Sequence, residues 1–572
     1  MVQTQTVQAT STRAIWRKRS LGKVNQLAGA LGDSVLEELL VNRGIVSATQ
    51  ALRFLQPHYD ELRLFGEKTA PRGLSQAVGR LVKAVHARER VIVFGDYDVD
   101  GVCAAAILVD VLGRAGLAVE AVLPDRERDG YGLQVGSIPD LLARKPSLVV
   151  TVDNGTQSHS AVEQLKRAGI SVVILDHHEP GPNLPKADVV INPKQSGETA
   201  TFRAACAAGL AFRLGKGLHD ALGVPAGQEK WLLDLAAIAT VCDMVPLAED
   251  NRLIVHFGLK TLGRTRRIGL QTLIDQSAGH DPLSSEIIGF RLGPRLNAAG
   301  RLEHAKRSLD LMLTRNHATA RQLTGLLDQL NRERQQLTRR IVTEALSEAQ
   351  QFEEEPALVL ASTNWPKGIC GLAASKVAER LNRPVFVLEQ GELCVGSGRS
   401  VPGVNLAEAI EQMRPLFVRA GGHAVAAGCT IRSDKLTQFR TGLVAFTRKK
   451  RGATVPAQIL EYDTDLALAQ VDLGLVNRLA QLEPYGMGNP RPVIKFTDCT
   501  IERMRLVGAD QQHVSVSLRQ GTQVRRAIAF SQAGEFNALG PGARLDILAR
   551  VRQNEWGGSK SAELQILATM VR

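Results

Sequence analysis

The stretch VIVFGDYDVDGVCAAAILVDVL, from Val91 to Leu112, decides the fold. Its first four residues are β-branched and aromatic, as in a buried strand, and its alanine-rich second half has the composition of a helix. Between them stand three aspartates at alternate positions, Asp96, Asp98 and Asp100. Three carboxylates this close repel one another, so a fold tolerates them where cations neutralise them or where water solvates them fully. The stretch therefore predicts a strand, an acidic turn and a helix, with a metal as the first hypothesis for the turn.

The spacing of these aspartates also opens a calcium-binding EF-hand loop, which requires a bidentate Glu at its twelfth position and a helix before its first. Counted from Asp96, the twelfth position is Ile107, and the residues before Asp96 have the pattern of a strand. The sequence therefore excludes an EF-hand. A second alternative stays open, in which the carboxylates cap the following helix and lie in water.

Four more short apolar runs follow the first, and helical stretches separate them. This alternation is typical of a parallel sheet with crossover helices. The five runs end, in order, at GDYDVDG, PDRERDGYG, DNGT, DHHEP and NPK. Ligands of open α/β sheets bind at the carboxyl ends of the strands, so we expect these five polar stretches to meet in one crevice.

The polar residues at these strand ends include a hard-oxygen set with one imidazole. The set consists of Asp96, Asp98, Asp100, Asp153 and His177, and Asp243 joins it from the end of an apolar helix. Such ligands suit Mn²⁺ or Mg²⁺ better than zinc. Five carboxylates are more than one such ion usually takes from a protein, so we expect two ions, with Asp153 as the bridge. Two ions can clamp the attacking and leaving oxygens of a displacement at phosphorus, which predicts phosphoester hydrolysis. The imidazole of His178 can donate to a phosphate oxygen or shuttle a proton.

The chain of 572 residues is long enough for several domains. We expect a mainly α/β protein: an N-terminal helical segment, a parallel-sheet catalytic domain, a long connector helix, a second and smaller α/β domain, and a C-terminal β-barrel of the OB type. The expected boundaries are 1–72, 73–315, 316–352, 353–450 and 451–572.

Charge and composition narrow the class of partner. The formal net charge of +12 favours a polyanion, nucleic acid before membrane. The seven cysteines are scattered and never form a Cys-x-x-Cys pair, so neither a disulfide framework nor a zinc site is implied. No apolar run approaches the roughly eighteen residues of a membrane helix. The first twenty residues lack the apolar core of a signal peptide, and we expect a cytoplasmic protein.

Several motifs resemble those of one known family. DHH at Asp176 to His178, with DYDVDG, DNG and Asp243 in VCDMVPL, resembles the DHH phosphoesterase family, and within it the exonucleases specific for single-stranded DNA. The stretches GPRLNAAGRL, GSGRS, GGHAVAAG and EPYGMGNPRP resemble further parts of those exonucleases, whose second domain is of the DHHA1 type. The resemblance covers nearly everything from Leu27 onward.

This resemblance implies a 5′ to 3′ exonuclease that degrades single-stranded DNA to mononucleotides with Mn²⁺ or Mg²⁺, in recombination and repair. It implies metal ligation by the six residues of the hard-oxygen set, and it implies that His178 lies near the scissile phosphate. It also implies substrate-binding residues: Arg295 and Arg301 for the terminal phosphate, and Arg399, Gly421, Gly422 and His423 in the second domain. A single-strand-binding protein and a RecQ-type helicase are the implied partners, and we expect a monomer.

Two rival functions share this core. A DHH phosphodiesterase that acts on small molecules or oligonucleotides would have the same metal site, but it has no need of a terminal barrel or a helical preface. A DNA-binding scaffold without activity would have lost metal ligands, and none of the expected ones is missing. The sequence therefore favours the nuclease.

Overall fold

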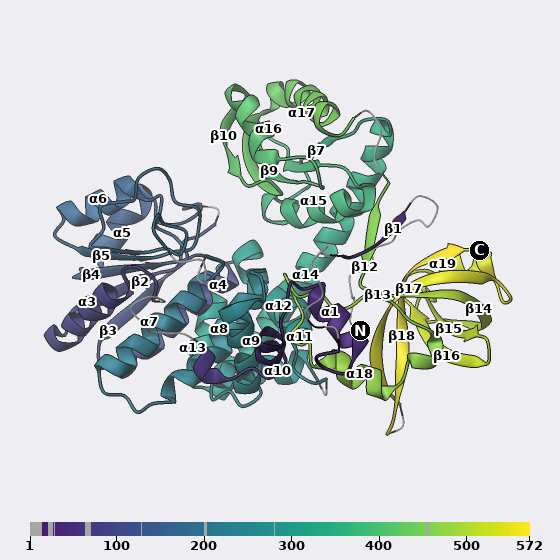
Figure 1. Cartoon of the computed structure of the whole chain (residues 1–572). Coiled ribbons are helices and arrows are strands. Elements are labelled where there is room, and N and C mark those ends of the chain that lie inside the picture. The colour runs from purple at the N-terminus through teal and green to yellow at the C-terminus, as the bar shows by residue number, and fades with distance from the viewer. Residues whose placement is uncertain are drawn as a thin grey trace.

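The structure of the chain is a computed structural model (Figure 1). It describes residues 14–20, 27, 29–62, 70–126, 128–198, 203–279, 281–452, 457–556 and 558–572. A parallel-sheet domain, a mixed-sheet domain and a β-barrel follow one another along the chain, and a long helix joins the first two (Figure 1).

The first domain contains the predicted parallel sheet, with five strands in the order β3-β2-β4-β5-β6. The strands are β2 (Arg90–Phe94), β3 (Ala118–Val122), β4 (Leu148–Val152), β5 (Ser171–Leu175) and β6 (Val189–Ile191). Alternate residues face opposite sides. Val91 and Val93 pack with α3 (Leu74–Ala87), α4 (Val99–Arg114) and α7 (Ala207–Ala221). Ile92 and Phe94 pack with α5 (Ile138–Ala143) and α6 (His159–Arg167) on the other face.

The order of the strands places a crevice at one edge of this sheet. The chain goes from β2 to β3 on one side and then to β4 on the other. The loops after β2 and β4 therefore leave the sheet side by side in opposite directions, which is where ligands bind in open α/β sheets.

A layer of helices completes the first domain, and one of these helices brings Asp243 close to the carboxyl ends of the strands. It contains α8 (Leu233–Cys242), α9 (Glu249–Leu262), α10 (Ile268–Ser277), α11 (Ser285–Ile287), α12 (Gly293–Leu302) and α13 (Lys306–Leu313). Helix α8 is apolar on all sides because it is buried on all sides, and it ends with Asp243 as its C-cap.

The connector predicted from the charged stretch is helix α14 (His317–Ala349), a single helix of 33 residues. At 1.5 Å per residue it is about 50 Å long. Leu323 and Leu327, near its start, pack into the core of the first domain. Ile341 and Ala345, near its end, pack with Trp365 of the second domain. The thin apolar stripe along this helix is therefore divided between two cores.

The second domain has a mixed sheet in the order β10-β11-β9-β8-β7. Its strands are β7 (Leu358–Ser362), β8 (Val385–Glu389), β9 (Leu393–Arg399), β10 (Phe417–Gly422) and β11 (Ala426–Arg432), and its helices are α15 (Lys367–Leu381), α16 (Leu406–Gln412) and α17 (Leu436–Arg451). Strands β7 and β8 are parallel, and the other pairs are antiparallel.

The C-terminal region is a closed barrel, as the sequence predicts. Its strands are β14 (Ile494–Val507), β15 (His513–Gln520), β16 (Gln523–Ala529), β17 (Arg544–Trp556) and β18 (Ser559–Val571). The order β14-β15-β16-β18-β17 closes through pairing of β14 with β17, and α19 (Ala533–Leu539) lies between β16 and β17 in the chain. This order and the helix position are those of the OB-fold.

The N-terminal helices pack on the C-terminal barrel. Leu36 and Leu39 of α1 (Ser34–Val41) share a core with strands of the barrel, and α2 (Ala48–Leu55) follows α1. Strand β1 (Ile15–Lys18) pairs in parallel with β12 (Ile459–Tyr462), although more than 400 positions separate them. Neither end of the chain contains a sequence pattern that predicts this pairing. Among the described helices, none has both the length and the apolar character that crossing a membrane requires.

Candidate functional site

The acidic turn after β2 gives its three aspartates three different environments. Asp98 is the N-cap of α4, and its Oδ1 accepts the backbone N–H of Asp100 at 2.9 Å. Asp100 is buried, and its two oxygens accept the N–H groups of Ala207 and Ala208 at 2.6 and 2.7 Å, at the start of α7. Asp96 is also buried, but its Oδ1 has no hydrogen-bond partner among the described residues. Helix capping therefore accounts for part of the turn and leaves Asp96 unexplained.

Two glycines allow the helices to approach this turn closely. A Cβ atom on Gly101 would lie 2.5 Å from the backbone nitrogen of Asp96. A Cβ atom on Gly300 of α12 would lie 2.3 Å from the carbonyl oxygen of Tyr97. Both distances are too short for any side chain, so the glycines of DYDVDG and NAAGR fix the position of the turn.

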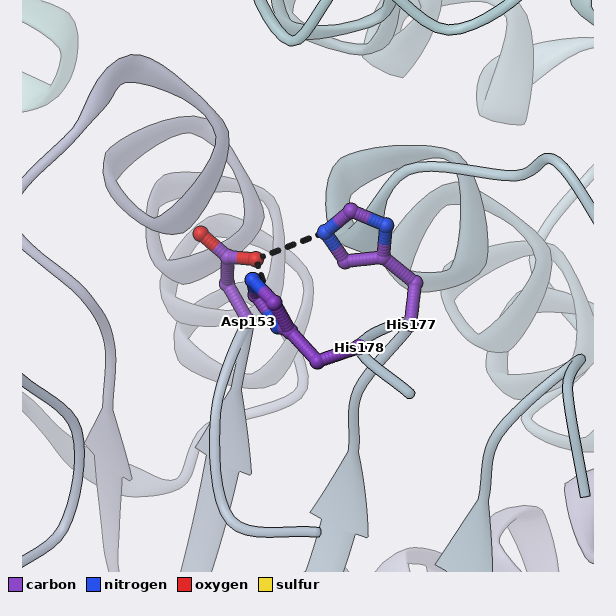
Figure 2. Close-up of side chains that lie close together, drawn as sticks. All are labelled: Asp153, His177 and His178. Carbon is purple, nitrogen blue, oxygen red and sulfur yellow. Dashed lines mark hydrogen bonds and ion pairs between the residues drawn. The ribbon is translucent and has the colours of Figure 1, made fainter. Parts of the chain in front are cut away.

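Asp153 lies at the end of β4 in a strained backbone conformation. Its φ of 64° is in the left-handed region, which a non-glycine residue rarely adopts. Asn154 holds the turn by donating from Nδ2 to the carbonyl of Phe94, at the end of β2, at 3.4 Å. Asp153 is buried, and its Oδ1 lies 3.0 Å from Nε2 of His177 (Figure 2). The strain therefore holds one carboxylate at the centre of the crevice.

The structure brings all seven predicted catalytic and ligand residues together. Their possible ligand atoms form three groups, within each of which all atoms lie within 4.8 Å of one another: Asp96, Asp98 and Asp153; Asp153, His177 and His178; Asp100, His177 and Asp243. We call these seven residues the carboxylate cluster. Asp153 belongs to two of the groups, the position that a bridging ligand requires.

Burial dominates the electrostatics of the cluster. Burial first, and neighbouring carboxylates second, raise the pKa of Asp153 well above its ordinary value, that of Asp100 to about 7 and that of Asp243 to about 9. Burial and the charge of His178 lower the pKa of His177 to about 3. The cluster therefore contains a neutral imidazole and carboxylates that cannot all ionise unless a cation is near.

Asp176 of the DHH motif and Tyr131 of PDRERDGYG, for which the sequence predicted no role, support His178. Nδ1 of His178 lies 2.8 Å from Oδ1 of Asp176, and Asp176 is fixed by the N–H of Thr156 at 2.9 Å. The hydroxyl of Tyr131 lies 3.0 Å from Nδ1 of His178 and donates to the carbonyl of Asp153. Burial lowers the pKa of His178, but the hydrogen bond and charge of Asp176 outweigh it and the net pKa is raised. Their sequence positions could have indicated this role, because both residues follow the ends of predicted strands.

A group of arginines lies beside the carboxylate cluster. Burial, together with the positive charges of Arg126, Arg334 and Arg399, lowers the pKa of Arg301, on α12, to about 10. The negative charge of Asp98 opposes this shift. These four guanidinium groups come from four separate segments, and we call them the arginine cluster.

The arginine cluster has no neutralising partner within the described parts of the chain, where no carboxylate lies within ion-pair distance of its members. Arg126 lies over the ring of Tyr97 at 4.5 Å. Nε of Arg334 is buried without a hydrogen-bond partner, and Arg399 donates to the carbonyl of Gly398 in its own strand. Partly buried guanidinium groups without carboxylates form a site for an anion such as phosphate.

The other predicted substrate-binding residues lie in different surroundings. Nη2 of Arg295 lies 2.9 Å from Oδ1 of Asp328, which ties α12 to α14. Gly421 and Gly422 are the last two residues of β10, and His423 begins the turn to β11; all three are exposed. Ala426, on the other side of this turn, is the cross-strand neighbour of Arg399. The turn is therefore next to the arginine cluster, whereas the guanidinium of Arg295 is engaged within the first domain.

A cleft of about 700 Å³ reaches the barrel from beside the carboxylate cluster, none of whose seven residues lines it. It begins at the residues on either side of Asp243 and passes between α14 and α15. Its lining includes Cys242, Met244, Arg334, Lys376, Arg491 and Arg550. Nε of Arg550, on β17, is buried there without a hydrogen-bond partner. Basic side chains from three domains therefore line the cleft, together with Glu286 and Glu379, and Arg491 pairs with Glu286 at 3.1 Å.

Comparison with known proteins agrees with this geometry. The models of the DHH family N-terminal domain, the DHHA1 domain and the RecJ OB domain match residues 90–240, 354–449 and 462–568. A single-stranded-DNA-specific exonuclease RecJ of Bacillus subtilis is 34% identical over 539 residues, which are 93% of this chain and 67% of that protein. The chain belongs to the RecJ family. Crystal structures of RecJ from Thermus thermophilus in complex with Mn²⁺ and with Mg²⁺ superpose on this RecJ family member with TM-scores of 0.83 and 0.78, at 29% and 28% identity. They cover 98% and 97% of this chain, which covers 80% and 78% of theirs.

Proposed function

We propose that this RecJ family member is an exonuclease that hydrolyses single-stranded DNA from the 5′ end to mononucleotides, with Mn²⁺ or Mg²⁺. The observation that carries the proposal is the position of the carboxylate cluster. It adjoins an arginine cluster without carboxylate partners among the described residues, and a cleft lined by several basic side chains runs from beside it to an OB barrel. Three sets of residues therefore serve three tasks. The carboxylate cluster serves metal-dependent hydrolysis, the arginine cluster serves recognition of a phosphate, and the cleft serves contact with the strand.

The residues of the carboxylate cluster fit divalent cations. Oδ1 of Asp96 and Oδ2 of Asp243 are buried without hydrogen-bond partners, so a cation would satisfy them. The donors are hard oxygens and a neutral imidazole, which suit Mn²⁺ and Mg²⁺. Two ions would be held by Asp96, Asp98, Asp100, Asp153, His177 and Asp243, and Asp153, which belongs to two of the three groups, is the carboxylate placed to contact both. When bound, the ions would supply Lewis-acid stabilisation of charge at phosphorus and a water of lowered pKa.

The side chains around the ions position the substrate. Arg301 and Arg399 bind the terminal phosphate through charge-assisted hydrogen bonds, and the turn of Gly421, Gly422 and His423 covers it from the second domain. His178, whose proton is held by Asp176, donates to an oxygen of the scissile phosphate. Tyr131 keeps the ring of His178 in place. The strained conformation of Asp153 fixes the bridge before substrate arrives.

The architecture favours a polymeric substrate over a small one. A DHH phosphodiesterase for small molecules would not require a cleft that continues past α14 to Arg550 on the barrel. Three domains border this cleft, and we infer that it admits one strand and excludes a duplex. Aromatic stacking has a small part in the barrel, because Phe496 is fully buried and Phe530 is partly covered by His513 and Arg552. The side chain of Trp556, a third candidate for stacking, lies outside the described residues.

Biological context extends the proposal. We infer action in DNA recombination and repair, in the cytoplasm, as a monomer that cooperates with a single-strand-binding protein and a RecQ-type helicase. We also propose that the chain divides into domains at residues 72, 315, 352 and 450. Helix α1 of the first segment packs on the barrel of the last segment.

The test is hydrolysis of a labelled single strand in Mn²⁺. A 5′ label is expected to appear at once as mononucleotide, while a 3′ label stays in long products. A matched duplex and a dinucleotide are expected to be poor substrates. Faster hydrolysis of the dinucleotide than of the long strand would favour the small-molecule phosphodiesterase instead.

A further inference from the structure

A pocket of about 380 Å³ lies on the first domain, at the opposite end of its helices from the carboxylate cluster. Helix α4 has Asp98 of that cluster as its N-cap, and Arg114 at its other end lines the pocket. The 16 residues of α4 span about 24 Å at 1.5 Å per residue. No residue that lines this pocket lines the cleft or belongs to the carboxylate or arginine cluster. We call it the Trp231 pocket; its lining includes Val111, His219, Leu222, Trp231, Leu232 and Arg266.

One polar atom of this lining lacks a partner. His219, in the last turn of α7, is only 9% exposed. Its Nδ1 is buried and makes no hydrogen bond to any described residue. Burial lowers the pKa of His219, so the imidazole is neutral at pH 7 and can use Nδ1 as a donor or as an acceptor. Because buried polar atoms are normally hydrogen-bonded, this nitrogen indicates a ligand with a hydrogen-bonding edge.

The walls around His219 suit a flat ring. Val111 and Leu232 contribute apolar side chains, and Trp231 contributes an indole. The volume of the pocket is within the range of small-molecule sites, about 300 to 1,000 Å³. A heterocycle with apolar faces and a hydrogen-bonding edge therefore matches both the walls and His219.

The cation that is free to bind a ligand is Arg266. Asp110 lies 2.8 Å from Arg114 and 2.9 Å from Arg267, so both of those guanidinium groups are neutralised. Arg266 is exposed and lies over the ring of Trp231 at 3.9 Å from its centroid. Within the described residues, no carboxylate lies within ion-pair distance of Arg266. A guanidinium group in this state suits a phosphate or a carboxylate.

The direction of the helices decides how such a ligand would lie. Ala115 and Leu222 line the pocket and are the C-caps of α4 and α7. The C-terminal ends of helices carry partial negative charge, which disfavours an anion beside them. The anionic group is therefore expected at Arg266, where an adjoining hollow of about 590 Å³ adds the exposed Arg315. A ring inside and an anion outside are the two ends of a mononucleotide.

We propose that the Trp231 pocket binds a mononucleotide, with the base beside His219 and the phosphate on Arg266. Mononucleotides are the product of the proposed function, so the choice of ligand rests on that function, but the binding can be measured without it. An acidic peptide that inserts a phenyl ring is the competing ligand. It is disfavoured because a phenyl ring would leave Nδ1 of His219 without a partner.

The experiment titrates dAMP into the full chain in EDTA, without DNA, and follows tryptophan fluorescence. The variant Trp231→Phe defines the part of the signal that comes from this pocket, and so separates it from dAMP bound at the arginine cluster. The test variants are His219→Leu and Arg266→Glu. The matched control is Arg264→Glu, the same change of charge at an exposed arginine two positions away that does not line the pocket.

The Trp231 signal should saturate with dAMP in the wild type. His219→Leu should weaken dAMP binding by about fivefold, the effect of one hydrogen bond, without lowering the Tm, because an unpaired buried group is removed. Arg266→Glu should weaken dAMP binding at least about tenfold but deoxyadenosine binding by less than about twofold, since Arg266 contacts the phosphate. Arg264→Glu should stay within about twofold of wild type for both ligands.

Three outcomes would overturn this site. They are the absence of a saturable Trp231 signal, equal dAMP affinities in the two test variants and the control, and displacement of dAMP by an equal concentration of inorganic phosphate, which would show that the base is not recognised. Failure of the chain to hydrolyse single-stranded DNA in Mn²⁺ would instead contradict the proposed function and leave the binding result intact.

Discussion

The carboxylate cluster and the arginine cluster lie next to each other but are assembled in different ways. Six of the seven residues of the carboxylate cluster stand at the ends or in the turns of three neighbouring parallel strands, β2, β4 and β5. The arginine cluster takes one residue from each of four segments: Arg126 after β3, Arg301 on α12, Arg334 on α14 and Arg399 on β9. The proposed chemistry therefore depends on the topology of one sheet, whereas the proposed recognition of the phosphate depends on how two domains are joined.

The largest effect is expected from Asp153→Asn in the carboxylate cluster. We expect kcat on single-stranded DNA to fall by roughly a thousandfold or more, because the bridge between the two ions is lost. Affinity for the strand should change by only a few-fold, since the arginine cluster and the cleft are intact. The metal-free Tm should not fall, because one buried charge is removed from a repelling group.

Measurement of metal binding distinguishes loss of the metal site in Asp153→Asn from misfolding of that variant. Mn²⁺ should raise the Tm of the wild type, because a ligand that binds only the folded state stabilises it. The rise should be much smaller for Asp153→Asn, and it should be unchanged for the control Asp140→Asn, whose carboxyl is exposed on α5. An equal rise in all three proteins would place the ions elsewhere.

A smaller effect is expected from Arg399→Ala in the arginine cluster. We expect KM to rise by about 10- to 100-fold with kcat changed less, because the guanidinium binds phosphate but takes no part in the metal site. The Tm should change little, since among the described residues the side chain of Arg399 donates only to the carbonyl of Gly398, its neighbour in the same strand. A lower Tm with unchanged KM would show that Arg399 is structural.

Tyr131→Phe tests the support of His178. The hydroxyl lies 3.0 Å from Nδ1 of His178 and donates to the carbonyl of Asp153. Its loss should lower kcat by about tenfold, the lower end of the effect of residues that orient ligands. Strand affinity in EDTA is the control and should equal that of the wild type. A kcat within twofold of wild type would remove Tyr131 from the mechanism.

The smallest effect on activity is expected from Arg295→Ala. Arg295 is engaged by Asp328, so its loss should leave kcat and KM within about twofold and lower the Tm by about 2 °C. The comparison with Arg399→Ala is direct, because both residues were predicted from the sequence to bind substrate. A tenfold rise in KM for Arg295→Ala would show instead that Arg295 binds the terminal phosphate.

Local patterns in the sequence determined the parallel sheet and the carboxylate cluster. Apolar runs of strand length specify the five strands, and parallel strands of one sheet bring their carboxyl ends to one edge. Every polar turn that follows a strand must therefore point to the same crevice. For this reason Asp96, Asp98, Asp100, Asp153, His177 and His178 were predictable without a structure.

The tertiary structure alone decided which arginines face the site and where the two ends of the chain meet. No local period in the sequence distinguishes Arg301, whose guanidinium is free of carboxylates, from Arg295, which Asp328 engages 33 positions away. Similarly, no sequence pattern predicts that Leu39 packs in the core of a barrel whose strands begin 455 positions later. Both contacts depend on packing between segments that are distant in the chain. The local sequence of one strand or helix does not specify which distant segment it packs against.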